Sequence, residues 1–195
     1  NNIDKVSLSL PPVFSDHMVL QQEQNVLFWG NSEPNSKITI VGSWGESSTS
    51  NSNDKGVWSL NLKTPSAGGP YDVSISSETT GFIKKEAKIT YKDILVGEVW
   101  LASGQSNMEW RLNQCDGCID NQEEEIKNAN YNDIRMFSVP QDLWGDAIKR
   151  QKWEITTSEN VEDFSATAYF FARKLNKELK IPIGIINSSW GGTRV

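Results

Sequence analysis

The stretch ILVGEVWLASGQSNMEW, Ile94 to Trp110, decides the fold of the second half of the chain. It begins with a nearly continuous apolar run holding one charge, which is typical of a strand covered on both faces. The small residues 102–104 then lead to Ser106, flanked by the amides Gln105 and Asn107. Because ligand sites of parallel sheets lie beyond the carboxyl ends of the strands, Ser106 is a candidate nucleophile. The alternative is that its hydroxyl only caps a following helix.

The residues after Trp110 continue an alternation of strands and helices. A second short strand is predicted over Ile134–Val139, and a third strand with a Gly-rich turn in IGIINSSWGGT after Pro182. Between them, apolar residues at spacings of three and four predict a helix running to about Lys180, with Ser165 as its N-cap. The predicted apolar stripe consists of Phe164, Ala168, Phe171, Leu175 and Leu179, with Phe164 and Tyr169 as a hydrophobic staple.

The residues before Asp93 follow a different pattern, with short apolar or alternating runs separated by Gly, Pro, Asn and Ser from Val26 to Tyr91. This pattern predicts an antiparallel β-sandwich. In GVWSLNL, Trp58, Leu60 and Leu62 alternate with polar neighbours, so one face of a strand is buried. The Ser/Asn-rich SSTSNSNDKG, residues 47–56, is interpreted as a hairpin loop with its turn at 54–56.

The sequence therefore predicts a β plus α/β protein. The expected parts are a β-sandwich module over residues 1–92 and a parallel-sheet domain over residues 93–195.

Composition narrows the function. The 195 residues are 37% hydrophobic, enough for a packed core, and carry a formal net charge of -6 with a pI near 4.9. Without a basic stripe, nucleic acid is not an expected partner. No run of about 18 apolar residues predicts a membrane span. Eight tryptophans are many for this length; core positions are expected for Trp29, Trp58 and Trp100, whereas Trp110, Trp144 and Trp190 are left open between core packing and sugar stacking.

Three stretches carry a resemblance to a known family. GQSNMEW (Gly104–Trp110) resembles the first block of the sialate O-acetylesterases, a branch of the SGNH and GDSL hydrolases. Leu10–Gln22 and Ile181–Thr193 resemble further stretches of the same family, in the same order. The resemblance implies a jelly-roll-like β-sandwich followed by the first part of a flavodoxin-like hydrolase domain.

The resemblance also implies roles for individual residues. Ser106 corresponds to the nucleophile, and its own N–H to one oxyanion donor. Gly191 and Gly192 correspond to the second block, with Gly192 as the preferred donor, since glycine lets the backbone approach an acyl oxygen closely. The α/β-hydrolase elbow G-x-S-x-G is not met, because Met108 stands at its last position.

Two blocks of the family have no counterpart in the sequence. One supplies an amide oxyanion donor, and the other, D-x-x-H, supplies the base and its orienting acid; both lie beyond Val195 in relatives. The only histidine, His17, lies in the stretch matching the β-module and is expected to be structural. The base is therefore expected from a C-terminal remainder of the same protein or from a second chain, and the 195 residues alone should have little or no activity.

Cys115 and Cys118 form a CxxC in a polar loop. With one distant histidine and no other cysteine, the ligand set for zinc is incomplete, and no metal site is expected. A loop disulfide in an exported protein and a pair of free thiols both fit the sequence, and the disulfide is preferred. The acidic run Glu123–Glu125 is interpreted as a solvated helix face. Together with family habit, the cysteines predict a secreted or periplasmic protein.

The leading functional hypothesis is a serine esterase that removes O-acetyl groups from sialic acid or related glycans through an acetyl-Ser106 intermediate, with no cofactor. Gln105, Asn107, Trp110 and Trp190 are candidate substrate contacts. Nothing in the residues selects one acetylated sugar. The alternatives are a noncatalytic carbohydrate-binding or scaffold fragment, and a processed two-chain esterase; a D-x-x-H after Val195 would favour catalysis.

Overall fold

The computed structural model describes residues 7–80, 84–142 and 147–193, without the side chains of residues 149 and 150. Within these residues the strands form a three-stranded sheet, in the order β1-β3-β6, and an eight-stranded sheet, in the order β10-β9-β11-β8-β7-β4-β5 with β2 paired to β8. The elements are β1 (Leu8–Ser9), β2 (Val19–Gln21), β3 (Asn25–Ser32), β4 (Lys37–Gly42), β5 (Ser47–Asn51), β6 (Val57–Lys63), β7 (Gly68–Glu78), β8 (Glu86–Gly104), α1 (Ser106–Glu109), α2 (Gln122–Asn128), β9 (Asn130–Ser138), the 3₁₀ turns η1 (Ala147–Arg150) and η2 (Val161–Asp163), β10 (Glu154–Thr157), α3 (Ala166–Leu179) and β11 (Ile183–Ser189).

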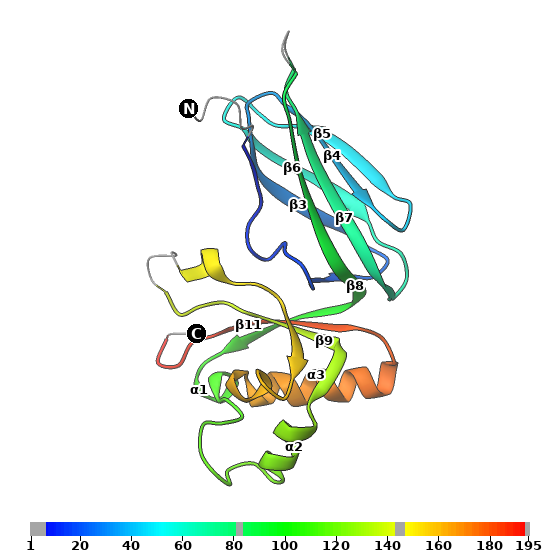
Figure 1. The fold of residues 1–195 in the computed structure, drawn as a ribbon. Coiled ribbons are helices and arrows are strands. Elements are labelled where there is room, and N and C mark those ends of the chain that lie inside the picture. Colours follow the sequence, from blue (N-terminus) through cyan, green and yellow to red (C-terminus); the bar gives the residue numbers. More distant parts are fainter. Residues whose placement is uncertain (1–6, 81–83, 143–146, 194–195) are drawn as a thin grey trace.

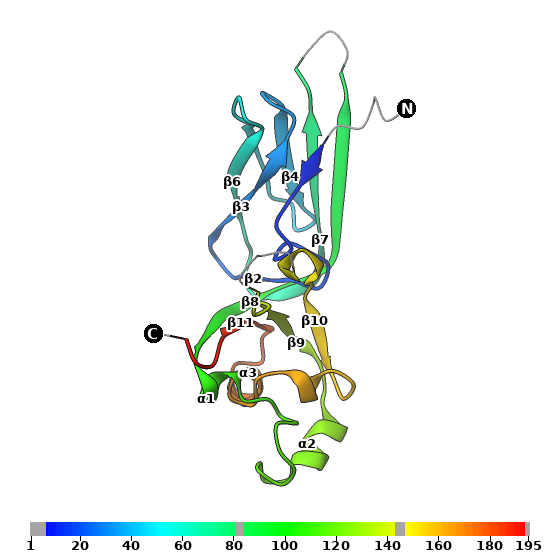
Figure 2. The same ribbon diagram turned by 90° about the vertical axis from the view of Figure 1, so that its left-hand side faces the viewer.

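Strand β8 runs through both parts of the molecule. Its first half pairs antiparallel with β7, for example Ile89 with Ile75, inside the sandwich. Its second half pairs in parallel with β11, from Glu98 with Ile183 to Gly104 with Ser189. Figures 1 and 2 show β8 leaving the upper sandwich and continuing as a strand of the lower sheet. The β plus α/β architecture predicted from the sequence is confirmed, and one strand joins its two parts.

The sandwich packs the sheet β1-β3-β6 against the strands β4, β5, β7 and the start of β8. The alternation predicted in β6 is confirmed, since Trp58, Leu60 and Leu62 are buried and the residues between them are exposed. The hairpin loop predicted over residues 47–56 is wrong. Residues 47–51 form strand β5 at the edge of the sheet, paired with β4, and β6 pairs with β3 in the other sheet. The turn at 54–56 therefore connects two sheets, and the polar composition of β5 suits a solvent-exposed edge.

In the lower part, the strands β9, β11 and β8 lie side by side and α3 packs against them. The predicted N-cap is confirmed, since the Ser165 hydroxyl accepts a hydrogen bond from the Ala168 N–H at 3.1 Å. The predicted apolar stripe is partly wrong. Phe171 and Leu179 are 41% and 49% exposed, whereas the residues buried within the helix are Ala166, Ala168, Tyr169 and Ala172. The face of α3 that packs against the sheet is thus formed by three alanines and Tyr169, and Phe171 and Leu179 lie outside it.

Two of the tryptophans expected in the core are half-exposed. Trp58 is buried, but Trp29 and Trp100 are 43% and 45% exposed. Trp29 packs edge-on against Phe14, and Trp100 packs edge-on against Phe171. Trp144, which the sequence left open, lies outside the described residues.

The coverage predicted for both faces of the run at 94–102 holds only at its start. Ile94–Gly97 is buried, with β2 paired alongside at Leu95–Gly97, whereas Leu101 is 67% exposed. Beyond Gly97, no strand in the described part of the chain pairs with this second edge of β8. Within the described residues, this edge of β8 is therefore unpaired, and the side chains along it are accessible to solvent.

The two parts are joined by packing as well as by β8. Trp153, just before β10, is buried in the same hydrophobic cluster as Phe28 and Ile75 of the sandwich. Its indole N–H donates to the Val13 carbonyl at 2.8 Å, and its ring lies against Phe137 of β9. Buried contacts of this kind restrict movement of the sandwich relative to the lower sheet.

An ion cluster lies at the same junction. Asp93, which lies within β8 and has a φ of 56°, accepts hydrogen bonds from the buried guanidinium of Arg135 at 2.9 Å and from His17 Nδ1 at 2.6 Å. Burial raises the pKa of Asp93, but the hydrogen bonds from Arg135 and His17 and their charges outweigh it, so the net pKa is below its ordinary value. Asp93 is therefore ionised at neutral pH and links the sandwich to β9.

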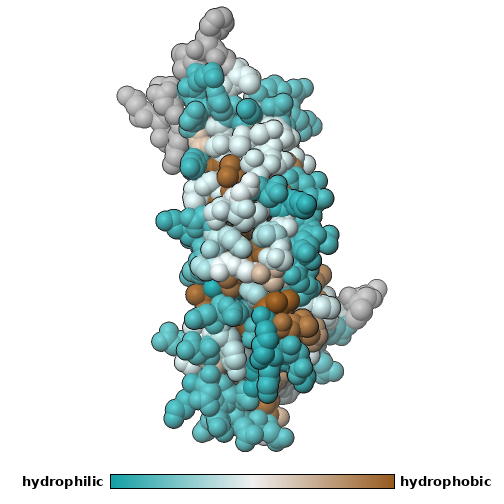
Figure 3. Space-filling model, turned by 90° about the vertical axis from the view of Figure 1, so that its right-hand side faces the viewer, coloured by the Kyte–Doolittle hydropathy of each residue, from teal (hydrophilic) through white to brown (hydrophobic). Residues whose placement is uncertain are grey.

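One face of the molecule carries mainly hydrophilic and intermediate residues. On this face hydrophobic residues form only small areas, the largest in its lower half (Figure 3). Among the described residues, no helix is long and apolar enough to cross a membrane.

We predict that Asp93→Asn destabilises the fold. Asparagine tolerates the positive φ at this position, so the substitution removes the charge and leaves Arg135 buried without its carboxylate. Because Asp93 is partly exposed, we expect a loss of about 1–3 kcal/mol in the free energy of unfolding, measured by urea denaturation. Asp72→Asn, at an exposed position of β7, is the control.

The same comparison has a defined pH dependence. A carboxylate with a lowered pKa stabilises the folded state above the ordinary aspartate value of 3.8, and this contribution is lost as the pH falls through the lowered pKa. The difference between wild type and Asp93→Asn should therefore shrink as the pH falls below about 4. A difference that keeps its neutral-pH size at the lowest pH at which both proteins still fold would contradict this assignment.

Candidate active site

Ser106 lies directly beyond the carboxyl end of β8, as the first residue of α1. It is exposed, and its carbonyl accepts a hydrogen bond from the Trp110 N–H at 2.9 Å. Its own N–H belongs to the first turn, where the helix offers no acceptor. Gly104, with a φ of 151°, makes the turn between strand and helix; a Cβ there would lie 3.1 Å from Met108 Cβ. The local backbone therefore presents the serine to solvent.

The turn after β11 lies against the turn that carries Ser106. The parallel register brings Ser189 beside Gly104, and the Trp190 N–H then donates to the Gly104 carbonyl at 2.9 Å. A Cβ on Gly191 would be 3.7 Å from Ser106 Cα. Figures 1 and 2 show the end of β11 next to α1. The structure thus brings together two stretches of the chain that the sequence separates by more than eighty residues.

The two glycines of this turn have different surroundings. The Gly191 N–H donates to the Glu109 carboxylate at 2.5 Å. Gly192 has a φ of 77°, a conformation that favours glycine, and no acceptor for its N–H occurs among the described residues. Of the two amides predicted as oxyanion donors, that of Gly192 is therefore the one still available to a ligand.

Glu109 and Gln141 are site residues that the sequence analysis missed. The Gln141 side-chain amide donates to Glu109 at 2.6 Å and lies 3.4 Å from the Ser189 carbonyl. These hydrogen bonds from Gln141 and Gly191 hold the pKa of Glu109 below its ordinary value, against a smaller effect of desolvation, so the side chain is ionised at neutral pH. Gln141 follows the end of β9. Because ligand sites in parallel sheets lie beyond the carboxyl ends of the strands, its position after a predicted strand was the signal that could have identified it.

An open cleft of about 480 Å³ adjoins these residues. Its polar lining includes Glu109, Arg111, Gln141, Asn187 and Ser189, and Pro140 and Val139 contribute apolar surface. Arg111 faces Asp163 across it at 3.9 Å. The volume is within the range of small-molecule sites.

The predicted substrate contacts are arranged around the Ser106 turn and the turn after β11, not in this cleft. Asn107 is exposed and its carbonyl accepts from the Thr167 hydroxyl at 3.0 Å, while the Gln105 carbonyl accepts from the N–H groups of Met108 and Glu109. Trp110 is 41% exposed and Trp190 is partly buried. Neither ring is among the described residues that line the cleft.

His17 is remote from Ser106. Its partner Asp93 binds Arg135 of β9. Across the sheet, Arg135 lies beside Gly184 of β11, and Gly184 lies beside Val99 of β8, so His17 is near the level of Val99. Gly104 lies five residues further along β8, about 16 Å at the usual rise of a strand. His17 is thus engaged at the junction. Within the described ranges, no cluster of three or more histidines, cysteines and carboxylates could hold a metal ion.

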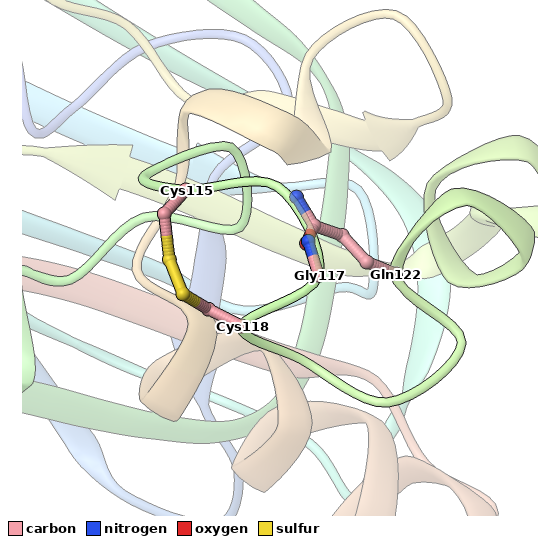
Figure 4. The surroundings of a disulfide bond; sticks show 4 residues. All are labelled: Cys115, Gly117, Cys118 and Gln122. Carbon is pink, nitrogen blue, oxygen red and sulfur yellow. A yellow bond between two sulfur atoms is a disulfide. The ribbon is translucent and has the colours of Figure 1, made fainter.

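Cys115 and Cys118 are joined by a disulfide in the loop between α1 and α2, with 5.7 Å between their Cα atoms. Figure 4 shows the bond together with Gly117 and Gln122, whose side-chain oxygen accepts from the Gly117 N–H at 3.1 Å. Glu125, in the acidic run of α2, pairs with Arg173 of α3. These contacts fix the loop on the side of α2.

Comparison with known proteins gives related matches over both parts of the chain. A family model described as carbohydrate esterase, sialic acid-specific acetylesterase, matches residues 96–195. Sialate O-acetylesterase from Homo sapiens is 33% identical over 93% of this chain, and that from Mus musculus 31% identical over 92%. The chain spans only 36% and 35% of these two proteins.

A solved structure has the same fold. The crystal structure of a carbohydrate acetylesterase from Xanthomonas citri superposes with a TM-score of 0.82 at 34% sequence identity. The match covers 95% of this chain and 41% of that one.

We predict that Gly191→Ala disturbs the contact between the two turns. The added Cβ would lie 2.5 Å from the Glu109 carboxylate oxygen, so the turn or the carboxylate must move. Because the clashing oxygen ends a flexible side chain, the carboxylate can move aside, and we expect a loss of less than about 1 kcal/mol in unfolding free energy, measured by urea denaturation.

A double-mutant cycle tests the cause. In a Glu109→Ala background the clashing atom is absent, so Gly191→Ala should cost less there. Equal costs in both backgrounds would show that the contact with Glu109 is not responsible.

Proposed function

The chain belongs to the sialic acid-specific acetylesterase family of carbohydrate esterases, and from this membership and the site geometry we propose that it provides the nucleophile of a serine esterase acting on O-acetylated sugars. The observation that carries the proposal is the contact between the Ser106 turn and the Gly191–Gly192 turn. It supports a nucleophile and an oxyanion site built at one edge of the sheet.

The proposed reaction follows the chemistry of a hydroxyl nucleophile. The Ser106 oxygen attacks the acetyl carbonyl carbon while a base takes its proton. Negative charge develops on the carbonyl oxygen, where the N–H groups of Ser106 and Gly192 are suited to donate hydrogen bonds. The intermediate collapses, the sugar oxygen leaves with a proton, and acetyl-Ser106 remains. Water then attacks the acetyl group by the same route and releases acetate.

We propose that the base lies outside the described residues. His17 is bound to Asp93 at the junction and is too far from Ser106 to accept its proton. Since the chain spans about a third of its curated relatives, the D-x-x-H expected from the resemblance is assigned to a C-terminal remainder of the protein. Trp100 and Leu101, exposed at the open edge of β8, agree with further packing there.

Sialic acid or a related acetylated glycan is the proposed substrate. The human relative is named for sialate esters and the Xanthomonas citri relative for carbohydrate acetyl esters in general. The cleft beside Glu109 offers amide, hydroxyl and guanidinium groups, which suit the hydroxyls of a sugar ring. Trp110, with its half-exposed ring, is the proposed stacking partner on the side of α1.

Export from the cytoplasm is also proposed. The disulfide between Cys115 and Cys118 supports it, because such bonds persist mainly in oxidising compartments. Protein purified from its native source without reductant should therefore show no reaction with a maleimide at these two cysteines until it is reduced and unfolded. Labelling of both cysteines in the freshly isolated native protein would argue for a reducing compartment.

We predict that Ser106→Ala abolishes esterase activity in the full-length protein. Removing the attacking oxygen should lower kcat for an acetylated sugar at least about 1,000-fold. It should also prevent labelling by a serine-directed phosphonate, detected by intact mass. Ser47→Ala, on the exposed edge strand β5, is the matched control and should retain both properties.

Labelling of the full-length wild type at Ser106 together with acetate release would support the esterase. A native protein that remains unlabelled and releases no acetate, yet binds glycan, would favour a noncatalytic binding module.

A further inference from the structure

The Glu109 carboxylate connects three segments that each follow the carboxyl end of a strand. Glu109 stands three residues after Ser106 on α1, beyond β8. One of its oxygens accepts the Gly191 N–H at 2.5 Å, beyond β11, and the other accepts the Gln141 amide at 2.6 Å, beyond β9. The same Gln141 amide lies 3.4 Å from the Ser189 carbonyl. A single carboxylate therefore fixes the relative positions of the nucleophile turn, the glycine turn and the loop after β9.

Gly191 lies close to the Glu109 carboxylate and in ordinary contact with the Ser106 turn. A Cβ at position 191 would be 2.5 Å from the Glu109 oxygen and 3.7 Å from Ser106 Cα. Glycine at 191 thus permits a carboxylate to reach the backbone between the two turns. The neighbouring Gly192 makes no comparable contact, since among the described residues other than its chain neighbours no atom lies within 4 Å of the Cβ position there.

The charge of Glu109 determines which role it can have. An ionised carboxylate only accepts hydrogen bonds, and it repels an oxyanion, so it does not itself stabilise the developing charge. By accepting the Gly191 N–H, it removes that amide from the set of oxyanion donors and leaves the Gly192 N–H as the donor of this turn. Its effect on the acyl oxygen is therefore indirect.

We infer that Glu109 is a positioning residue, which holds the Gly191–Gly192 turn against the Ser106 turn so that the Gly192 N–H meets the acyl oxygen. The inference rests on the proposed function, because it requires Ser106 to be the nucleophile. Misplacing a catalytic group by about 1 Å can cost about 100-fold in rate, and loss of an oxyanion donor costs about 100- to 1,000-fold. A change that loosens the turn but keeps the Gly192 N–H should therefore lower the rate by less than the loss of an oxyanion donor does.

The experiment uses the full-length protein with the variants Glu109→Ala, Glu109→Asp and Glu109→Gln. We expect Glu109→Ala to lower kcat for an acetylated sugar about 10- to 100-fold, with KM changed less than about 3-fold, because the turn acts on the transition state. Glu109→Asp, one methylene shorter, should lose at least about 10-fold, since its carboxylate falls short of Gly191. Glu109→Gln keeps an oxygen acceptor for the Gly191 N–H and should stay within about 5-fold of wild type.

Three comparisons isolate the positioning role. The rate of phosphonate labelling at Ser106 should fall in parallel with kcat, because the phosphonate also forms a tetrahedral oxyanion. The pH profile of kcat should keep its shape in Glu109→Gln, because Glu109 transfers no proton. Glu178→Gln, an exposed glutamate in the last turn of α3, is the matched control and should leave every parameter unchanged.

The contrary results are distinct from failure of the esterase proposal. If Ser106→Ala is inactive but Glu109→Ala keeps kcat within about 2-fold, the positioning role is wrong and the nucleophile stands. A rise in KM alone would make Glu109 a sugar contact, and a lost limb of the pH profile would make it the base; either overturns the inference. If Glu109→Ala does not fold, Glu109→Asp decides, since full activity there contradicts the inference. An active, unlabelled Ser106→Ala would instead overturn the proposed function.

Discussion

The fold depends on the backbone hydrogen bonds of one strand, β8. It pairs with β7 in the sandwich and with β11 in the lower sheet, and β2 covers it at the passage between them. Because both sets of hydrogen bonds involve the same strand, β8 links the sandwich directly to the lower sheet. Gly97 lies at this passage, where a Cβ would come within 2.0 Å of the Pro182 carbonyl oxygen. Only a glycine lets the loop before β11 approach β8 so closely.

The β-sandwich and the lower sheet are joined by side-chain contacts at the junction between them. Apolar packing around Trp153 continues the sandwich core into the lower part, and Asp93 adds a charged link between His17 and Arg135. A buried guanidinium is costly without a carboxylate partner, so this link favours one arrangement of the two parts over others. The single histidine of the sequence, His17, is thereby engaged in a structural contact. For this reason we propose that the base that accepts the Ser106 proton is another residue.

The site follows from the parallel pairing of β8 with β11. In a parallel pair the two strands end on the same side, so the turns after them meet. The serine turn and the glycine turn are then joined by the Trp190 N–H on the Gly104 carbonyl and by the Gly191 N–H on Glu109. A ligand beside Ser106 would encounter backbone N–H groups held in place before it arrives, which is the arrangement that favours stabilisation of a developing charge.

Local patterns in the sequence determined much of this protein. The alternation in β6, the buried apolar segment 94–97 of β8 and the Ser165 cap were predicted, because periodicity and capping depend on near neighbours in the sequence. Only the tertiary structure decided which strands pair and which faces are covered. It made a strand of the polar β5 and left Trp100 and Leu101 exposed, because neither outcome is set by the residues themselves but by the presence or absence of a neighbouring strand. Only the tertiary structure also revealed the hydrogen bond between Glu109 and Gly191, because a contact between residues 82 positions apart produces no periodic pattern in the sequence.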